Sequence, residues 1–125
     1  MEFTTLGRTG LNVSVASLGC GGGSALGKSS GKSEEHSISV VRKAMDLGVN
    51  FLDTASAYGT ETIVGKAIKD VPRDQVIIST KHHGAWQGRF YSPEDVVAGL
   101  DNSLRALNTD YVDIFHLHGI APKYF

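Results

Sequence analysis

Short apolar runs alternate with amphipathic segments along the whole chain of 125 residues, and this alternation restricts the fold more than any other feature. Such a pattern is typical of β-α units laid over a parallel sheet. The predicted strands are residues 13–18, 49–53, 76–81 and 111–118. The sequence therefore predicts an α/β fold in the order β-α-β-α-β-α-β, within a single domain that covers residues 1–125.

The helices between these strands are marked by local signals. Ser33 is a candidate N-cap for a helix that starts at about residue 34, and Gly48 stands where a helix-ending glycine belongs. The second predicted helix covers residues 61–69. The third opens at residues 92–95, Ser-Pro-Glu-Asp, which supply an N-cap, a proline at the first helical position and acids in the first turn.

The last predicted strand has no covering helix after it, although parallel strands are normally buried on both faces. A (β/α)8 TIM barrel runs to ~250 residues, so four strands in a chain of this length amount to half of one. Two folds remain open, a small four-stranded sheet and the N-terminal half of a barrel. A half barrel would have open edge strands, through which the chain could self-associate or act as a non-catalytic assembly partner.

Chemically active side chains lie at the carboxyl ends of three predicted strands, where α/β enzymes keep their active sites. Asp53, Lys81 and His118 end the second, third and fourth strands, and Tyr58 lies in the loop after the second. An ammonium stabilises a nearby phenolate, a carboxylate keeps the ammonium charged, and a histidine can orient a carbonyl oxygen that accepts a proton. This set suits reduction of a carbonyl with hydride from a bound cofactor.

The segment GVNFLDTASAYG, residues 48–59, resembles the Asp-Thr-Ala-x-x-Tyr-Gly signature of the aldo-keto reductases. Three more segments are similar to that family: LGRTGLNVS (6–14), ISTK (78–81) and SLRALNTDYVDIFHLH (103–118). The resemblance spans nearly the whole chain in the family's order. It implies the N-terminal half of a barrel that opens with a hairpin at about 3–14, and a parent activity of NADP(H)-dependent reduction of an aldehyde or ketone to an alcohol.

The resemblance also implies a role for each residue of the set. Tyr58 would donate the proton, and Lys81 and Asp53 would set how readily its hydroxyl does so. His118 would contact the small-molecule substrate and orient its carbonyl. The neighbouring His116 is expected to be a polar interior residue one layer below.

The cofactor would bind beside the same residues. Gly21, Gly22 and Gly23 occupy the first β-α loop, which resembles the family's loop beside the nicotinamide ribose, and Asp53 completes the predicted NADP(H) contacts. Trp86, in the loop after the third strand, is a candidate wall of the substrate pocket. The family grips the 2′-phosphate with segments that follow later strands, so the preference for NADP over NAD comes from the resemblance alone.

Two nucleotide-binding motifs are weaker alternatives. Residues 22–29, GGSALGKS, match the P-loop pattern G-x-x-x-x-G-K-[ST] after a predicted strand. A P-loop needs its helix to begin at the Lys-Ser pair, but residues 30–32 come before the better helix start at Ser33. The dinucleotide fingerprint fails, because Ser24 stands where a third glycine or alanine is required.

Histidine pairs raise the question of a metal site. His82 and His83 are adjacent, and His116 and His118 share one face of a strand, but the spacing supplies no clear third ligand. We therefore expect no metal, and we expect His82 and His83 to be exposed loop residues.

Charge and cysteine content exclude other classes of function. The chain has 12 Lys and Arg against 13 Asp and Glu and no basic run, so we expect no basic patch of the kind that binds nucleic acid. No apolar run approaches the ~20 residues of a membrane span. The only cysteine, Cys20, cannot form an internal disulfide, which indicates a cytoplasmic protein.

Overall fold

A four-stranded parallel sheet in the order β3-β4-β5-β8 forms the centre of the computed structural model, which describes residues 1–120. The last five residues of the predicted domain lie outside the described part. The strands are β3 (Leu18–Gly19), β4 (Phe51–Asp53), β5 (Ile77–His83) and β8 (Ile114–His118). The parallel α/β arrangement is the one that the sequence predicts, and within residues 1–120 β3 and β8 each pair with a strand on one side only.

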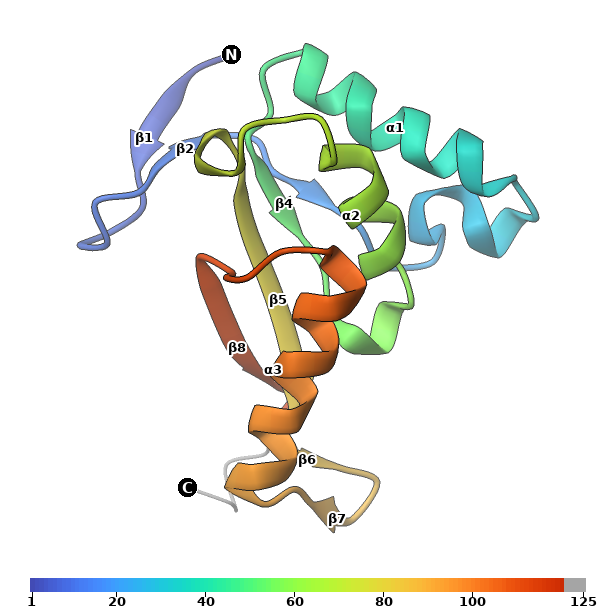
Figure 1. The fold of residues 1–125 in the computed structure, drawn as a ribbon, viewed down its shortest axis with the longest axis vertical. Helices are drawn as coiled ribbons and strands as arrows, with labels where there is room; N and C mark the ends of the chain where they lie inside the picture. The colour runs from blue at the N-terminus through green and yellow to red at the C-terminus, as the bar shows by residue number, and fades with distance from the viewer. Residues whose placement is uncertain (121–125) are drawn as a thin grey trace.

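The helices of the described chain cover one face of this sheet (Figure 1). They are α1 (Glu34–Asp46), α2 (Glu61–Ile68) and α3 (Pro93–Leu107). Ser33 caps α1 as predicted, because its side chain accepts a hydrogen bond from the backbone N–H of His36. Ser92 and Asp95 form a capping box at the start of α3. Within residues 1–120, no helix is both long enough and apolar enough to cross a membrane.

Smaller elements lie at the two ends of the sheet (Figure 1). The antiparallel pair β1 (Phe3–Thr5) and β2 (Asn12–Ser14) forms a hairpin at the amino end, where the resemblance implies one. A second pair, β6 (Ala85–Trp86) and β7 (Arg89–Phe90), lies at the carboxyl end and was not predicted. Short 3-10 turns are η1 (Ala25–Ser30), η2 (Ser56–Tyr58) and η3 (Arg73–Gln75).

The prediction of one strand over residues 13–18 was wrong, because β2 ends at Ser14 and the chain enters the parallel sheet only at Leu18. The break is held by Asn50: its Oδ1 accepts the Ser14 backbone N–H at 2.7 Å, and its own N–H donates to the Ser14 hydroxyl at 3.1 Å. The fourth strand also begins later than predicted. Residues 111–113 are held instead by Arg73, whose guanidinium binds the Tyr111 carbonyl and the Asp113 carboxylate.

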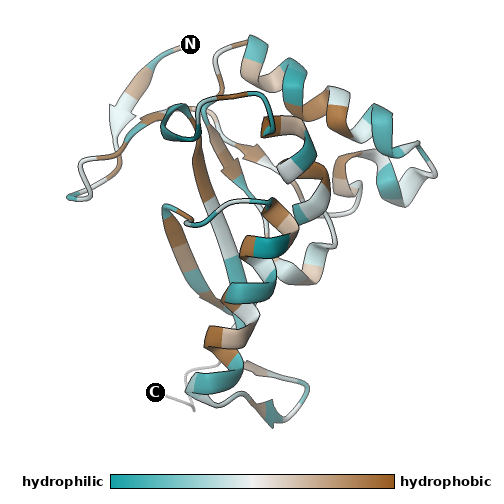
Figure 2. Cartoon of the chain, in the orientation of Figure 1, coloured by the Kyte–Doolittle hydropathy of each residue, from teal (hydrophilic) through white to brown (hydrophobic). Residues whose placement is uncertain are grey.

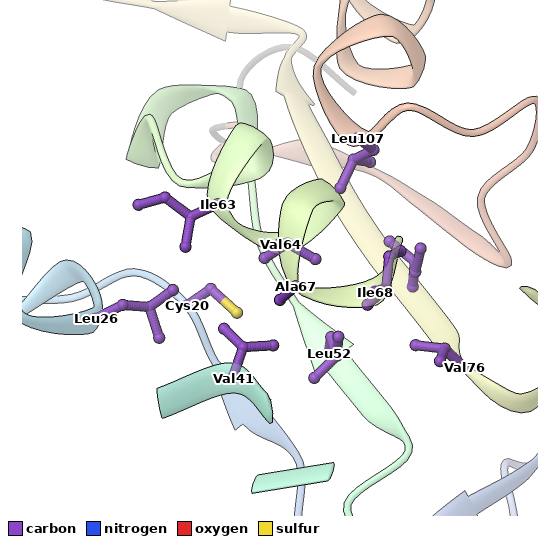
Figure 3. Packing of buried hydrophobic residues seen from close by; sticks show 11 residues of the cluster. Cys20, Leu26, Val41, Leu52, Ile63, Val64, Ala67, Ile68, Val76 and Leu107 are labelled. Atoms are coloured by element: carbon purple, nitrogen blue, oxygen red, sulfur yellow. The ribbon is translucent and has the colours of Figure 1, made fainter. Parts of the chain in front are cut away.

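Apolar side chains from the sheet and the helices form one core between them (Figure 3). Leu52 and Ile78, neighbours in the β4–β5 register, are fully buried against Val41 of α1 and Val64 of α2. Burying each such side chain contributes roughly 1.5–3 kcal/mol to folding. Both helices carry brown, hydrophobic stretches interrupted by teal, hydrophilic ones (Figure 2), as a helix with one buried face requires.

The packing of Leu52 and Ile78 decides which side chains face away from the helices. Successive residues of a strand point to opposite faces of the sheet. Asp53 and Ser79, the next residues along β4 and β5, therefore lie on the helix-free face, side by side in register. The residues that follow at intervals of two, Lys81 in β5 among them, share that face.

The contact between α2 and α3 gives a test of this packing. A Cβ added at Gly65 would lie 2.5 Å from the backbone oxygen of Leu107. Alanine normally stabilises a helix interior by ~1 kcal/mol relative to glycine. We expect Gly65→Ala to destabilise the protein instead, by about 1–3 kcal/mol, in urea unfolding followed by circular dichroism.

The matched control is Gly23→Ala, since a Cβ there meets nothing within 4 Å. We expect its unfolding midpoint to stay close to that of the wild type. A Gly65→Ala protein that is as stable as the wild type would contradict the close approach of the two helices.

Candidate active site

An ion pair between neighbouring strands lies on the helix-free face. Nζ of Lys81 donates to Asp53 Oδ1 at 2.8 Å and Oδ2 at 2.7 Å, and to the Thr54 carbonyl oxygen at 2.8 Å. The Ser79 hydroxyl donates to Asp53 Oδ1 at 2.9 Å. The Lys81 side chain is 17% exposed and that of Asp53 is 32% exposed. The ammonium is thus held in one place, close to solvent.

Tyr58 lies beside this pair, at the end of the short turn η2. Nζ of Lys81 is 5.1 Å from the centroid of the Tyr58 ring. The turn is tied to β5, because the Ser56 hydroxyl donates to the Lys81 carbonyl oxygen at 3.1 Å. Gly21 also packs against the ring, since a Cβ there would lie 2.5 Å from the Tyr58 ring carbon Cδ2. Only a glycine lets the loop backbone come this close.

His118, at the end of β8, meets the Tyr58 ring edge to face. The two ring centroids are 5.7 Å apart and the planes are perpendicular. Burial lowers the pKa of His118 below its ordinary value, and His83 and Lys81 lower it further, while Asp53 acts in the opposite direction. At neutral pH His118 is therefore an uncharged imidazole. The structure brings together Asp53, Tyr58, Lys81 and His118, the four residues that the sequence singles out.

The expectation that His82 and His83 are exposed loop residues was wrong. Both lie in β5, which continues past its predicted end because its backbone pairs with β8 as far as His83 opposite His118. His82 faces the helices and meets the Tyr91 ring edge to face. His83 lies on the helix-free face, stacked on His118. The alternation from Ser79 through Lys81 to His83 is the signal that could have placed it there.

The other predicted residues lie around this group. Trp86 stacks on His83 with the ring centroids 4.5 Å apart, and it is 50% exposed. His116 pairs with Lys81 in register, but it is exposed rather than interior in the described chain. Gly22 and Gly23 have open space where a Cβ would be.

The segment that matches a P-loop does not form one. Leu26 and Gly27 have positive φ angles inside η1, and α1 begins only at Glu34. The ammonium of Lys28 donates to the Gly59 carbonyl oxygen at 3.0 Å, which links this loop to the turn that carries Tyr58. Backbone N–H groups of a helix start are what a P-loop offers a phosphate, and here they are not at the Lys-Ser pair. Residues 1–120 contain no group of three or more His, Cys, Asp or Glu side chains placed to hold a metal ion.

A parallel β/α sheet with polar side chains gathered at its carboxyl end is the arrangement of a (β/α)8 barrel active site. Residues 17–124 match the family model described as "Aldo/keto reductase family". The chain is 41% identical to aldo-keto reductase YhdN of Bacillus subtilis, over 98% of this chain and 39% of that protein. It is 40% identical to L-galactose dehydrogenase of Arabidopsis thaliana, over 96% of this chain and 39% of that protein.

The crystal structure of the thermostable aldo-keto reductase Tm1743 with the inhibitor epalrestat has a similar fold, with a TM-score of 0.82 and 32% identity, over 98% of this chain and 44% of that one. The chain therefore belongs to the aldo/keto reductase family, and it spans 39% of the length of the curated relatives named above. Its fold is the N-terminal half of a (β/α)8 barrel, as the resemblance implies, and not a small closed sheet.

Cys20 gives a test of the electrostatics beneath the site. It is fully buried, and burial, followed by the Asp53 carboxylate, raises the pKa of Cys20 to about 12, while Lys81 acts in the opposite direction. At about pH 8 the thiol is therefore protonated and shielded. We expect a disulfide reagent such as DTNB to label the native protein roughly 100-fold more slowly than the protein unfolded in guanidinium chloride.

Cys20 is the only cysteine, so the absorbance reports this site alone. Labelling at equal rates in the native and unfolded states would show that the thiol is neither buried nor protonated.

Proposed function

We propose that this chain carries the catalytic groups of an NADP(H)-dependent oxidoreductase that reduces an aldehyde or ketone to an alcohol, with Tyr58 as the proton donor. One observation supports this most directly. The Lys81 ammonium, fixed by both oxygens of Asp53, lies 5.1 Å from the centre of the Tyr58 ring. Family membership is consistent with such a reaction.

This geometry supports the following proton step. The Tyr58 hydroxyl gives its proton to the carbonyl oxygen of the substrate while the carbonyl carbon accepts a hydride, so the product is the alcohol. The Lys81 ammonium stabilises the phenolate that Tyr58 becomes. Asp53 holds the lysine ammonium through both carboxylate oxygens and stops its flexible stem from turning away. A preorganised charge of this kind needs no rearrangement at the moment of reaction.

His118 and Trp86 would position the substrate. An uncharged imidazole can donate one hydrogen bond to the carbonyl oxygen without placing a second full charge beside Lys81. Trp86 is half exposed at the same end of the sheet, where its ring could form a wall of the substrate pocket.

The residues around Tyr58 fit the nicotinamide end of NADPH. Gly22 and Gly23 leave space for a ribose to approach the backbone, next to Gly21 against the Tyr58 ring. The partly exposed carboxylate of Asp53 has lone pairs left to accept a ribose hydroxyl. When bound, NADPH supplies the hydride. NADPH is preferred to NADH on the family resemblance, and a single buried thiol agrees with a cytoplasmic location.

Removal of the Tyr58 hydroxyl tests the proton donor. We expect Tyr58→Phe to lower turnover by roughly 10²–10⁴-fold, because the phenol is the group that gives the proton. Its dissociation constant for NADPH should stay close to that of the wild type. The assay follows NADPH absorbance with a panel of aldehydes and ketones, and includes L-galactose with NADP⁺ because a 40% identical relative is an L-galactose dehydrogenase.

The competing explanation is that Asp53 and Lys81 form a structural ion pair that only fills the end of the sheet. In that case Tyr58→Phe would turn over as fast as the wild type, and the assignment of Tyr58 would be wrong.

Cofactor binding can be tested separately from turnover. A titration of the purified 125-residue chain with NADPH, followed by cofactor fluorescence, should show saturable binding in the micromolar range. A Gly23→Trp variant should weaken it at least tenfold, because a bulky side chain would occupy the open loop beside Tyr58. The absence of saturable binding would show that these residues alone do not build a cofactor site.

A further inference from the structure

Three aromatic rings form a continuous stack at the carboxyl end of the sheet. The Trp86 and His83 ring centroids are 4.5 Å apart with planes inclined by 24°, and those of His83 and His118 are 4.8 Å apart with planes inclined by 1°. The proposed reaction uses His118 and Trp86 but gives His83 no task. His83 is nevertheless the middle ring, in contact with both.

The sheet itself determines where His83 lies. His83 and His118 are partners in the parallel β5–β8 register, and neighbouring strands lie about 4.7–4.9 Å apart, which matches the spacing of the two rings. Nδ1 of His83 is also 3.2 Å from the His118 carbonyl oxygen. Because a carbonyl oxygen can only accept, this hydrogen bond places the proton of His83 on Nδ1. His83 is thus fixed by a hydrogen bond as well as by its neighbours.

His118 lacks the contact that usually orients a functional histidine. Such a ring is normally held by a hydrogen bond to the nitrogen that does not meet the substrate. Nδ1 of His118 is buried, and it has no hydrogen-bond partner among residues 1–120. Since Nδ1 is closed to solvent, Nε2 is the nitrogen left to meet a substrate. Rotation of the His118 ring is restrained instead by the His83 ring and by the edge contact with Tyr58.

We propose that His83 is a positioning residue for His118: its ring, held between Trp86 and His118, keeps the His118 imidazole at the rotation that presents Nε2 toward the substrate side of the site. That Nε2 donates a hydrogen bond to the substrate carbonyl oxygen rests on the proposed function. The ring orientation is a property of the free chain, so it can be tested without substrate or cofactor.

The charges around the stack agree with this role. His118 faces His83 and Lys81 from β5, Asp53 from β4 and Tyr58 from η2. Two imidazolium rings 4.8 Å apart would repel each other, so the stack is stable while at most one ring is charged. Burial, His83 and Lys81 lower the pKa of His118, and Asp53 acts in the opposite direction. The stack is therefore intact at neutral pH and weakens in acid.

NMR of the 125-residue chain labelled with ¹⁵N-histidine tests the proposal. The readouts are the nuclear Overhauser contacts between the His118 and Tyr58 rings and the pH titration of the His118 nitrogens, assigned with His118→Gln. We expect His83→Ala to weaken the ring contacts at least twofold and to move the His118 titration midpoint upward. His83→Phe retains a flat ring at the same place and should preserve the contacts between His118 and Tyr58.

The matched control is His116→Ala, which removes an exposed histidine from the same face and should leave both readouts unchanged. If His83→Ala loses its dispersed amide spectrum, His83→Leu, which keeps volume without a flat ring, replaces it with the same expectation. Unchanged His118 signals in His83→Ala or its replacement would overturn the proposal, and so would an equal change in His116→Ala.

Turnover gives an independent readout. If the protein reduces carbonyls, His83→Ala should lower kcat about tenfold at unchanged NADPH affinity, and His83→Phe should restore most of it. Turnover that is unaffected by His83→Ala would overturn the link between ring orientation and catalysis. Absence of turnover in the wild type contradicts the proposed function alone, because the NMR result decides the positioning of His118 by itself.

Discussion

The ion pair between Lys81 and Asp53 is the interaction on which the helix-free face depends. Two opposite charges taken partly out of water cost free energy unless each finds its hydrogen bonds. Here the ammonium is bound by both carboxylate oxygens and by the Thr54 carbonyl, and Ser79 donates to the carboxylate as well. The pair joins β4 to β5 and places a positive charge beside the Tyr58 ring. It also contributes to the pKa shifts of Cys20 and His118.

The pair can exist because one face of the sheet is apolar and packs against the helices, while the other face carries the polar side chains. Leu52 and Ile78 turn toward the helices and supply the apolar burial that holds the sheet together. Their neighbours Asp53 and Ser79 turn the other way, so polar groups gather there without interrupting the core. A shift of the β4–β5 register by one residue would exchange the two sets and place charges in the apolar layer.

Much of the fold was predictable because its signals are local. The starts of α1 and α3 depend on Ser33 and Ser92, each of which bonds a backbone N–H three residues away. The break between β2 and β3 was not predictable, since it depends on a contact between Ser14 and Asn50, 36 residues apart. The β6–β7 hairpin escaped prediction for another reason. Its turn has positive φ at Gln87, a residue that does not ordinarily mark such turns.

The sequence by itself determined that Asp53, Lys81 and His118 lie toward the carboxyl ends of successive strands, with Tyr58 in the loop after the first of them, because strand periodicity and chain order can be read from it. The tertiary structure decided that β5 extends as far as His83. The strand continues only where β8 offers a partner, and that partner lies 35 residues further along the chain. The lowered pKa of His118 also depends on the tertiary structure, because the burial and the neighbouring charges that shift it come from several strands at once. Chain order fixes which residues can meet, whereas register and packing fix how they meet.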